Sequence, residues 1–169
     1  AAGLVAAWRS AQAGRETLLL EASPRMASKV RISGGGKCNL THAGPVRELL
    51  AAFPARQGRF LRPALHAFSN ADLVELMRRE GVDTYVRADG RVFPLARPGS
   101  AREVVQALVG LAEGAGVGFR TGTRVTGLEV RGSTVTGLLT GADRLEPGRV
   151  ILATGGASYP RTGTRGEAL

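Results

Sequence analysis

The chain has 169 residues, of which 43% are hydrophobic and 22% are charged, and these values are typical of a single soluble globular domain. No apolar run reaches the roughly 18 residues that a membrane span needs, so we expect no membrane partner. The single cysteine, Cys38, excludes an internal disulfide framework and fits a reducing compartment. We therefore expect a cytoplasmic protein.

The formal net charge is +9, and clustered cations at this level would suggest a nucleic-acid partner. Of the 23 basic residues, however, all but Lys29 and Lys37 are arginines, and they are spread along the whole chain. Aromatic residues make up only 5% of the chain, and none interleaves with a basic run. We expect no nucleic-acid partner. A basic nucleic-acid-associated protein stays an alternative, which binding with a steep salt dependence would reveal.

The first predicted elements are an alanine-rich helix that ends near Gly14 and a short buried strand at 17–21. Together they look like the second half of a βαβ nucleotide-binding unit whose first strand is missing. Ala1-Ala2-Gly3 would be the last part of the G-x-G-x-x-G fingerprint, and Glu21 follows Gly3 by eighteen residues. This spacing suits the acid that binds a ribose hydroxyl, with Ala22 beside it. The alternative is an ordinary helix and core strand with a solvated Glu21.

The segment from Lys29 to Thr41 contains three consecutive glycines flanked by cations. Such a backbone can approach a ligand closely and direct N–H groups at an anion, and we expect a loop here. A P-loop is excluded, because Arg31 and Cys38 stand where that motif needs Gly and Ser or Thr. The predicted binding positions are Lys29, Ser33, Gly34, Gly35, Gly36, Lys37, Cys38 and Asn39.

The middle of the chain predicts two amphipathic helices and a hairpin. Ser69 or Asn70 caps a helix that runs to about Glu80, and Ser100 caps one that runs to Gly114. Between them, Asp89-Gly90 joins strands at 84–86 and 91–93. Trp8 and Met77 are expected in the core.

Four short strands are predicted after the second helix, at 118–121, 124–130, 134–139 and 149–153. We expect an α/β nucleotide-binding domain in which an antiparallel β-meander precedes a central parallel strand, Val150–Ala153. Thr154-Gly155-Gly156 would bend the backbone at the carboxyl end of that strand, where open α/β sheets bind ligands. An ordinary glycine turn is the alternative. Val125, at the start of the strand at 124–130, would suit the core, whereas the family resemblance described next implies a contact to adenine there.

The segment Ser33–Thr41 resembles the signature of a bacterial family of FAD-dependent oxidoreductases, described as NAD(P)/FAD-dependent or aminoacetone-oxidase-like flavoproteins. Further matches are 67–70, 90–94, 153–156 and 158–160. The resemblance implies a Rossmann-like, glutathione-reductase-like FAD domain over 1–169 that is incomplete at both ends. It also implies a β-rich second domain and a helical segment after residue 169.

The resemblance implies that the protein passes electrons between NAD(P)H or a small organic substrate and an acceptor through bound FAD, and that this fragment alone is inactive. A nucleotide-binding module without redox turnover is the alternative. No residue is a clear catalytic acid or base, Cys38 has no partner for a dithiol relay, and His42 and His66 have no partners at metal-ligand spacing. The positions assigned to FAD are Ala1, Ala2, Gly3, Glu21, Ala22, Lys29, Ser33, Gly34, Gly35, Gly36, Lys37, Cys38, Asn39, Val125, Ala153, Thr154, Gly155 and Gly156.

Overall fold

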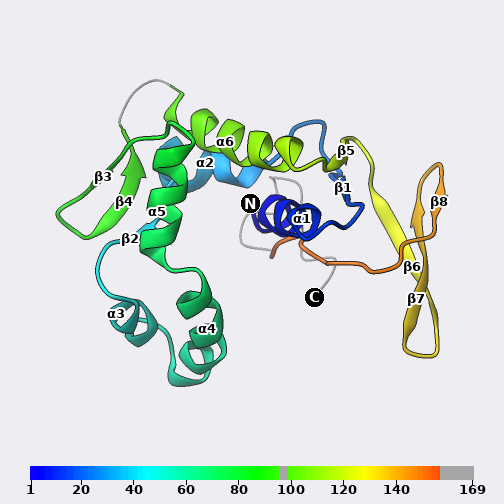
Figure 1. Cartoon of the computed structure of the whole chain (residues 1–169), viewed down its shortest axis with the longest axis horizontal. Helices are drawn as coiled ribbons and strands as arrows, with labels where there is room; N and C mark the ends of the chain where they lie inside the picture. Colours follow the sequence, from blue (N-terminus) through cyan, green and yellow to red (C-terminus); the bar gives the residue numbers. More distant parts are fainter. Residues whose placement is uncertain (96–98, 157–169) are drawn as a thin grey trace. The chain divides into compact units, whose positions relative to one another are not determined.

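The computed structural model describes residues 1–95 and 99–156, and the predicted match at 158–160 lies outside this range (Figure 1). The chain divides into two compact units. The first consists of Ala1–Lys29 and the part of the chain from Leu108 onward, and the second is Val30–Ala107.

The first unit begins with the predicted helix and strand. Helix α1 spans Ala2–Gln12, buries Leu4, Ala7 and Trp8, and is followed by Gly14 with a φ of +73°. Strand β1 spans Leu18–Leu20, contacts α1, and pairs in parallel with β5, Gly118–Arg120. A helix beside a parallel strand pair confirms the α/β class for this unit. The expected full burial of β1 is wrong, because β5 is its single neighbour among the described strands and Leu18 stays 45% exposed.

The antiparallel meander is confirmed. It consists of β6 (Val125–Arg131), β7 (Thr134–Thr140) and β8 (Arg144–Leu145), in that spatial order. The strand at 118–121 does not belong to this series, as it pairs with β1 instead.

The expected central strand at 149–153 is wrong. No strand is present there in the described part of the chain, and Ile151 and Leu152 are 66% and 58% exposed. An extended segment becomes a strand only when a neighbour supplies ladder hydrogen bonds, and none of the described strands lies in register with it.

The second unit is built on a three-stranded antiparallel sheet in the order β2-β4-β3. Strand β2 spans Thr41–His42, β3 spans Thr84–Val86 and β4 spans Arg91–Pro94, so the predicted hairpin is confirmed. Helix α5, Asn70–Arg79, contacts β2 and β3 and buries Met77 completely. It starts as predicted, because Ser69 and Asp72 form a capping box.

Two helices precede α5 that the sequence analysis did not predict as a pair. Helix α3 spans Val46–Ala51 and α4 spans Ala55–Ala67, and each follows a proline at its N-cap position. They approach closely at Gly58, where a Cβ atom would lie 2.9 Å from the Leu50 carbonyl oxygen. His66 is exposed on the last turn of α4.

Helix α6, Ser100–Gly114, has the predicted apolar face, with Val104, Val105 and Leu108 buried. Ser100 is not its cap, because the Glu103 N–H donates to the Gly99 carbonyl and Gly99 therefore holds the cap position. Helix α2 spans Ser28–Gly36, and its first residues are helical where the sequence analysis expected a loop. The expected loop is present from Ser33 to Gly35, where the backbone leaves helical geometry.

Candidate functional site

The N-terminus of α1 can receive an anion. Its N-cap residue, Ala1, makes no side-chain capping bond, and its first turn contains no acidic residue. The first N–H groups of a helix have no partner inside the helix, and the helix dipole places partial positive charge beside them. A Cβ atom on Gly3 would lie 3.5 Å from the Cβ of Ala153. The structure therefore brings two predicted positions, Gly3 and Ala153, into contact, with room for an alanine at Gly3.

Glu21 follows directly after β1, as the fingerprint requires. Its Oε1 accepts hydrogen bonds from the Ser23 N–H at 2.8 Å and from the Ser23 hydroxyl at 2.9 Å. Within the described residues no donor reaches Oε2, which leaves an acceptor for a ribose hydroxyl. Its half-buried neighbour Ala22 adds no polar side chain.

The start of the meander lies beside Glu21. The Thr123 N–H donates to the Glu21 carbonyl oxygen at 3.0 Å, and β6 begins two residues later at Val125. Val125 is 38% exposed, so it is not the core valine that the sequence left open. An apolar side chain beside Glu21 would suit an adenine ring, and the adenine contact remains a prediction.

Lys29 and Gly156 are also brought together, although they are 127 residues apart in sequence. The Lys29 ammonium donates to the Gly156 carbonyl oxygen at 2.6 Å. Gly155 has a φ of +81°, in the left-handed region that favours glycine, and the bend expected at Thr154–Gly156 stays a prediction.

The triple glycine in the second unit adopts left-handed backbone geometry at Gly34, Gly35 and Gly36. The three positions differ in their surroundings. A Cβ atom on Gly34 would lie 2.8 Å from Cε1 of Phe93 and 2.9 Å from the backbone nitrogen of Asn39. Nothing lies within 4 Å of such an atom on Gly35. Gly34 therefore packs against the protein, whereas Gly35 leaves its backbone open to a ligand.

Cys38 is buried beneath the glycine loop and ties its two ends together through a backbone hydrogen bond. It is 3% exposed, its own φ is +57°, and its N–H donates to the Ser33 carbonyl at 2.9 Å. Burial raises the pKa of the Cys38 thiol, which keeps it protonated and poorly nucleophilic. Asn39, with its amide nitrogen turned toward the sheet, donates to the carbonyls of Thr41 and Val92. These two residues therefore shape the loop.

Arg31 is a candidate that the sequence analysis missed. Its Nε is buried and has no hydrogen-bond partner in the structure, and a buried donor without a partner is costly. It stands three residues before Gly34, and Lys37 is exposed just after the glycines. A phosphate oxygen at this loop would provide the missing acceptor. The sequence signal for Arg31 was its position beside the three glycines. The sequence analysis used that residue only to exclude a P-loop.

The predicted positions are divided between the two units: Ser33–Asn39 belong to the second, and all the others belong to the first. In each unit the residues present fit a phosphate-bearing dinucleotide such as FAD. The first offers the N-terminus of α1 and the carboxylate of Glu21, and the second offers an open glycine backbone and the buried Arg31 Nε, which lacks a hydrogen-bond partner. Within residues 1–95 and 99–156, no group of three His, Cys, Asp or Glu side chains is placed to hold a metal. No helix in the same ranges is both long and apolar enough to cross a membrane.

Known proteins resemble this chain in sequence and in fold. Ribosomal RNA dihydrouridine synthase of Escherichia coli (strain K12) is 30% identical over 169 residues, which cover 96% of this chain and 39% of that protein. The 3-dehydro-bile acid delta(4,6)-reductase of Clostridium scindens is 28% identical over 171 residues, covering 99% of this chain and 40% of that protein. The chain thus spans about two fifths of the length of these relatives.

The crystal structure of THI4 from Thermovibrio ammonificans matches with a TM-score of 0.52 at 14% identity, over 81% of this chain and 42% of that one, and this likeness shows the fold. The family model described as "HI0933-like protein Rossmann domain" matches residues 1–169. The chain therefore belongs to the HI0933-like Rossmann domain family, whose members are FAD-dependent oxidoreductase-like flavoproteins.

Proposed function

We propose that the protein containing this chain is an FAD-dependent reductase that takes electrons from NAD(P)H and saturates a carbon–carbon double bond conjugated to a carbonyl group. The observation that carries the proposal is the family match over the whole chain. The names of two relatives, which form dihydrouridine in ribosomal RNA and reduce a 3-dehydro-bile acid, support the reaction class. Dihydrouridine is uridine with its C5–C6 double bond saturated, and a Δ4 double bond in a 3-oxo steroid is conjugated to a carbonyl in the same way.

The described residues support FAD as the cofactor. The N-terminus of α1 would bind the pyrophosphate and Glu21 would accept hydrogen bonds from the ribose. The Gly35 backbone, Lys37 and Arg31 would contact a phosphate or the flavin edge. FAD supplies the two-electron chemistry that the reduction needs, and the protein supplies orientation and electrostatics. We assign no catalytic acid or base.

The absorption spectrum of the full-length protein tests this proposal. We expect a yellow protein that releases FAD on heating and loses its flavin absorbance when NADH or NADPH is added without oxygen. The matched substitutions Glu21→Gln and Glu129→Gln serve as probe and control, because Glu129 is bound to Arg144 on the meander. A colourless protein, or one that contains FMN, would contradict the cofactor assignment. A flavin that dithionite reduces but both pyridine nucleotides leave oxidised would favour the nucleotide-binding module.

We further propose a cytoplasmic location. A lone buried thiol and the use of a pyridine nucleotide both fit that compartment. Cell fractionation followed by immunoblotting checks it, with recovery in the membrane or extracellular fraction as the contrary result.

A further inference from the structure

The α3–α4 hairpin, residues 46–67, carries unneutralised positive charge. No acidic residue occurs between Glu48 and Asp72 in the sequence. In the described part of the chain, the exposed arginines of this hairpin form no ion pair, whereas arginines of α5, the β3–β4 hairpin and the meander are paired with carboxylates. The arginines of the hairpin are Arg47, Arg56, Arg59 and Arg62.

Exposed aromatic rings stand among these cations. Phe60 is 83% exposed and Phe53 is 41% exposed, although a phenylalanine ring is usually buried. They line an open hollow of about 500 Å³ together with Arg56, Gln57 and Leu61. Arg56 and Phe60 are four residues apart on α4 and therefore lie on one face of the helix. The hollow thus combines aromatic faces, an amide and a guanidinium.

This combination fits an unpaired nucleic-acid strand better than it fits an apolar protein surface. A partner that covered the hollow with apolar groups would leave Arg56 buried without a counter-ion, which is costly. A nucleic-acid strand supplies both complements: a base stacks on an exposed ring, and the phosphates on either side neutralise the arginines. Gln57 adds a donor and an acceptor for a base edge.

We propose that the α3–α4 hairpin binds an unpaired RNA strand, with a base held between Phe53 and Phe60 and phosphates on Arg56, Arg59 and Arg62. The choice of RNA over DNA rests on the proposed function, because one of the two relatives that support it forms dihydrouridine in ribosomal RNA. The sequence analysis expected no nucleic-acid partner because the arginines were dispersed along the chain. Four of them nevertheless lie in one helical hairpin, where they form no ion pair within the described residues.

Binding of fluorescein-labelled oligonucleotides to the full-length protein, followed by fluorescence anisotropy, tests the proposal. The probes are a uridine-rich single-stranded RNA, the DNA strand of the same sequence, and the RNA duplex. We expect the single-stranded RNA to bind most tightly. F60A should weaken its binding by roughly tenfold or more, and F60W should restore it, because stacking needs an aromatic ring. The triple variant R56Q/R59Q/R62Q should reduce the slope of log K against log salt by about 2, since each phosphate contact on a single strand contributes about 0.7.

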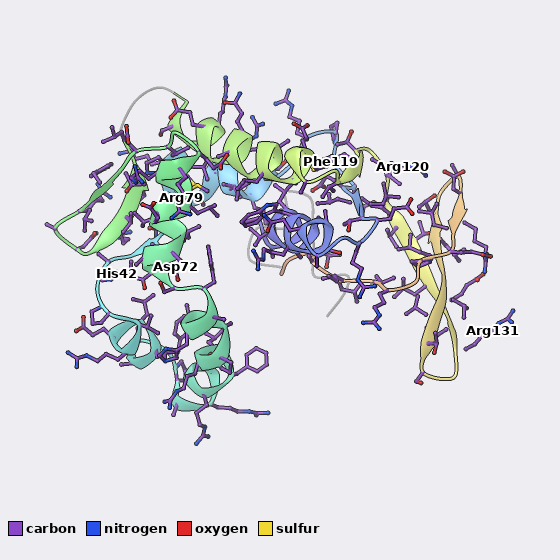
Figure 2. All side chains as sticks on the ribbon, in the orientation of Figure 1. His42, Asp72, Arg79, Phe119, Arg120 and Arg131 are labelled. Carbon is purple, nitrogen blue, oxygen red and sulfur yellow. The ribbon has the colours of Figure 1, made fainter. Side chains whose placement is uncertain are left out.

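The control is R79Q/R120Q/R131Q, which removes the same charge from α5, β5 and the β6–β7 hairpin, where these arginines are labelled in Figure 2. It should leave RNA affinity nearly unchanged. Equal losses in both triple variants would mean that only net charge matters and would overturn the proposal. A lowered melting temperature in F60A with unchanged RNA affinity would overturn it too. Phe60 would then stabilise the fold by packing against the rest of the protein and would not contact RNA. Flavin content is measured on each sample. A flavin-containing protein that does not bind RNA would refute the RNA-binding proposal alone. A flavin-free protein that binds RNA through Phe60 would refute the proposed reductase function alone.

Discussion

Alanine at Gly34 should destabilise the protein more than alanine at Gly35, although both glycines are left-handed, with φ of +58° and +69°. Left-handed geometry costs an alanine about 1–2 kcal/mol, and this cost applies at both positions. At Gly34 the added Cβ would also stand 2.8 Å from the ring of Phe93, which is 1% exposed and cannot move aside freely. Overpacking of this kind costs about 1–3 kcal/mol more. We therefore expect a loss of about 2–5 kcal/mol for Gly34→Ala and about 1–2 kcal/mol for Gly35→Ala.

Urea unfolding of the full-length protein, with and without excess FAD, measures both losses. Without FAD, the midpoint for Gly34→Ala should fall well below that for Gly35→Ala at an unchanged m-value. With FAD present, Gly35→Ala should additionally lose part of the cofactor's stabilisation, because its backbone faces the open side of the loop. Equal losses without FAD would refute the packing role of Gly34, and a larger loss for Gly35 would show that the loop is differently arranged.

The other predictions concern single side chains. Glu21→Gln should weaken FAD binding by about 1–3 kcal/mol, whereas Glu129→Gln should not, and titration calorimetry of the apoprotein compares them. Cys38→Ser should leave the rate of flavin reduction largely intact and cost about 1 kcal/mol of stability, because the thiol is buried and protonated; a hundredfold slower reduction at full FAD occupancy would make the thiol catalytic. Ser69→Ala removes half of the capping box and should cost about 1 kcal/mol in urea unfolding. Hydrogen bonds from Arg78 and Arg79 lower the pKa of Glu75 from 4.5 to about 2. The contribution of Glu75 to the free energy of unfolding is therefore present above pH 4.5 and is lost as the pH falls toward 2. The difference in the free energy of unfolding between the protein and Glu75→Gln should shrink over that interval.

Local chemistry determined the elements that the sequence predicted well. Ser69 and Asp72 form a capping box because their spacing lets each bond the other's backbone, and this spacing is visible in sequence. Asp89-Gly90 turns the hairpin because Gly90 adopts a φ of +78° at little cost. The triple glycine predicted a loop, and its three residues have positive φ. In each case the required partners lie within a few residues of one another.

Elements that depend on distant partners were predicted poorly. The residues at 150–153 have a strand-like composition, yet a strand also needs a hydrogen-bonding neighbour, which no local pattern reveals. Similarly, Gly118–Arg120 has the length and flanking turns of a meander strand, but its partner is β1, about a hundred residues earlier. The pairing of α3 with α4 was not predicted, because the exposed Phe60 blurs the apolar periodicity on which a helix assignment rests.

The cations of the glycine segment separate into different roles once the fold is known. The sequence assigned Lys29 and Lys37 equally to the neutralisation of a phosphate. The Lys29 ammonium already donates to the Gly156 carbonyl oxygen. This hydrogen bond holds Gly156 beside the start of α2. Lys37 is exposed and makes no such contact, and Arg31 has a buried Nε that lacks an acceptor. A carbonyl can satisfy an ammonium, but the buried Nε of Arg31, three residues before the glycines in sequence, still lacks an acceptor. Arg31 is therefore the cation at this loop whose environment a bound phosphate would improve most.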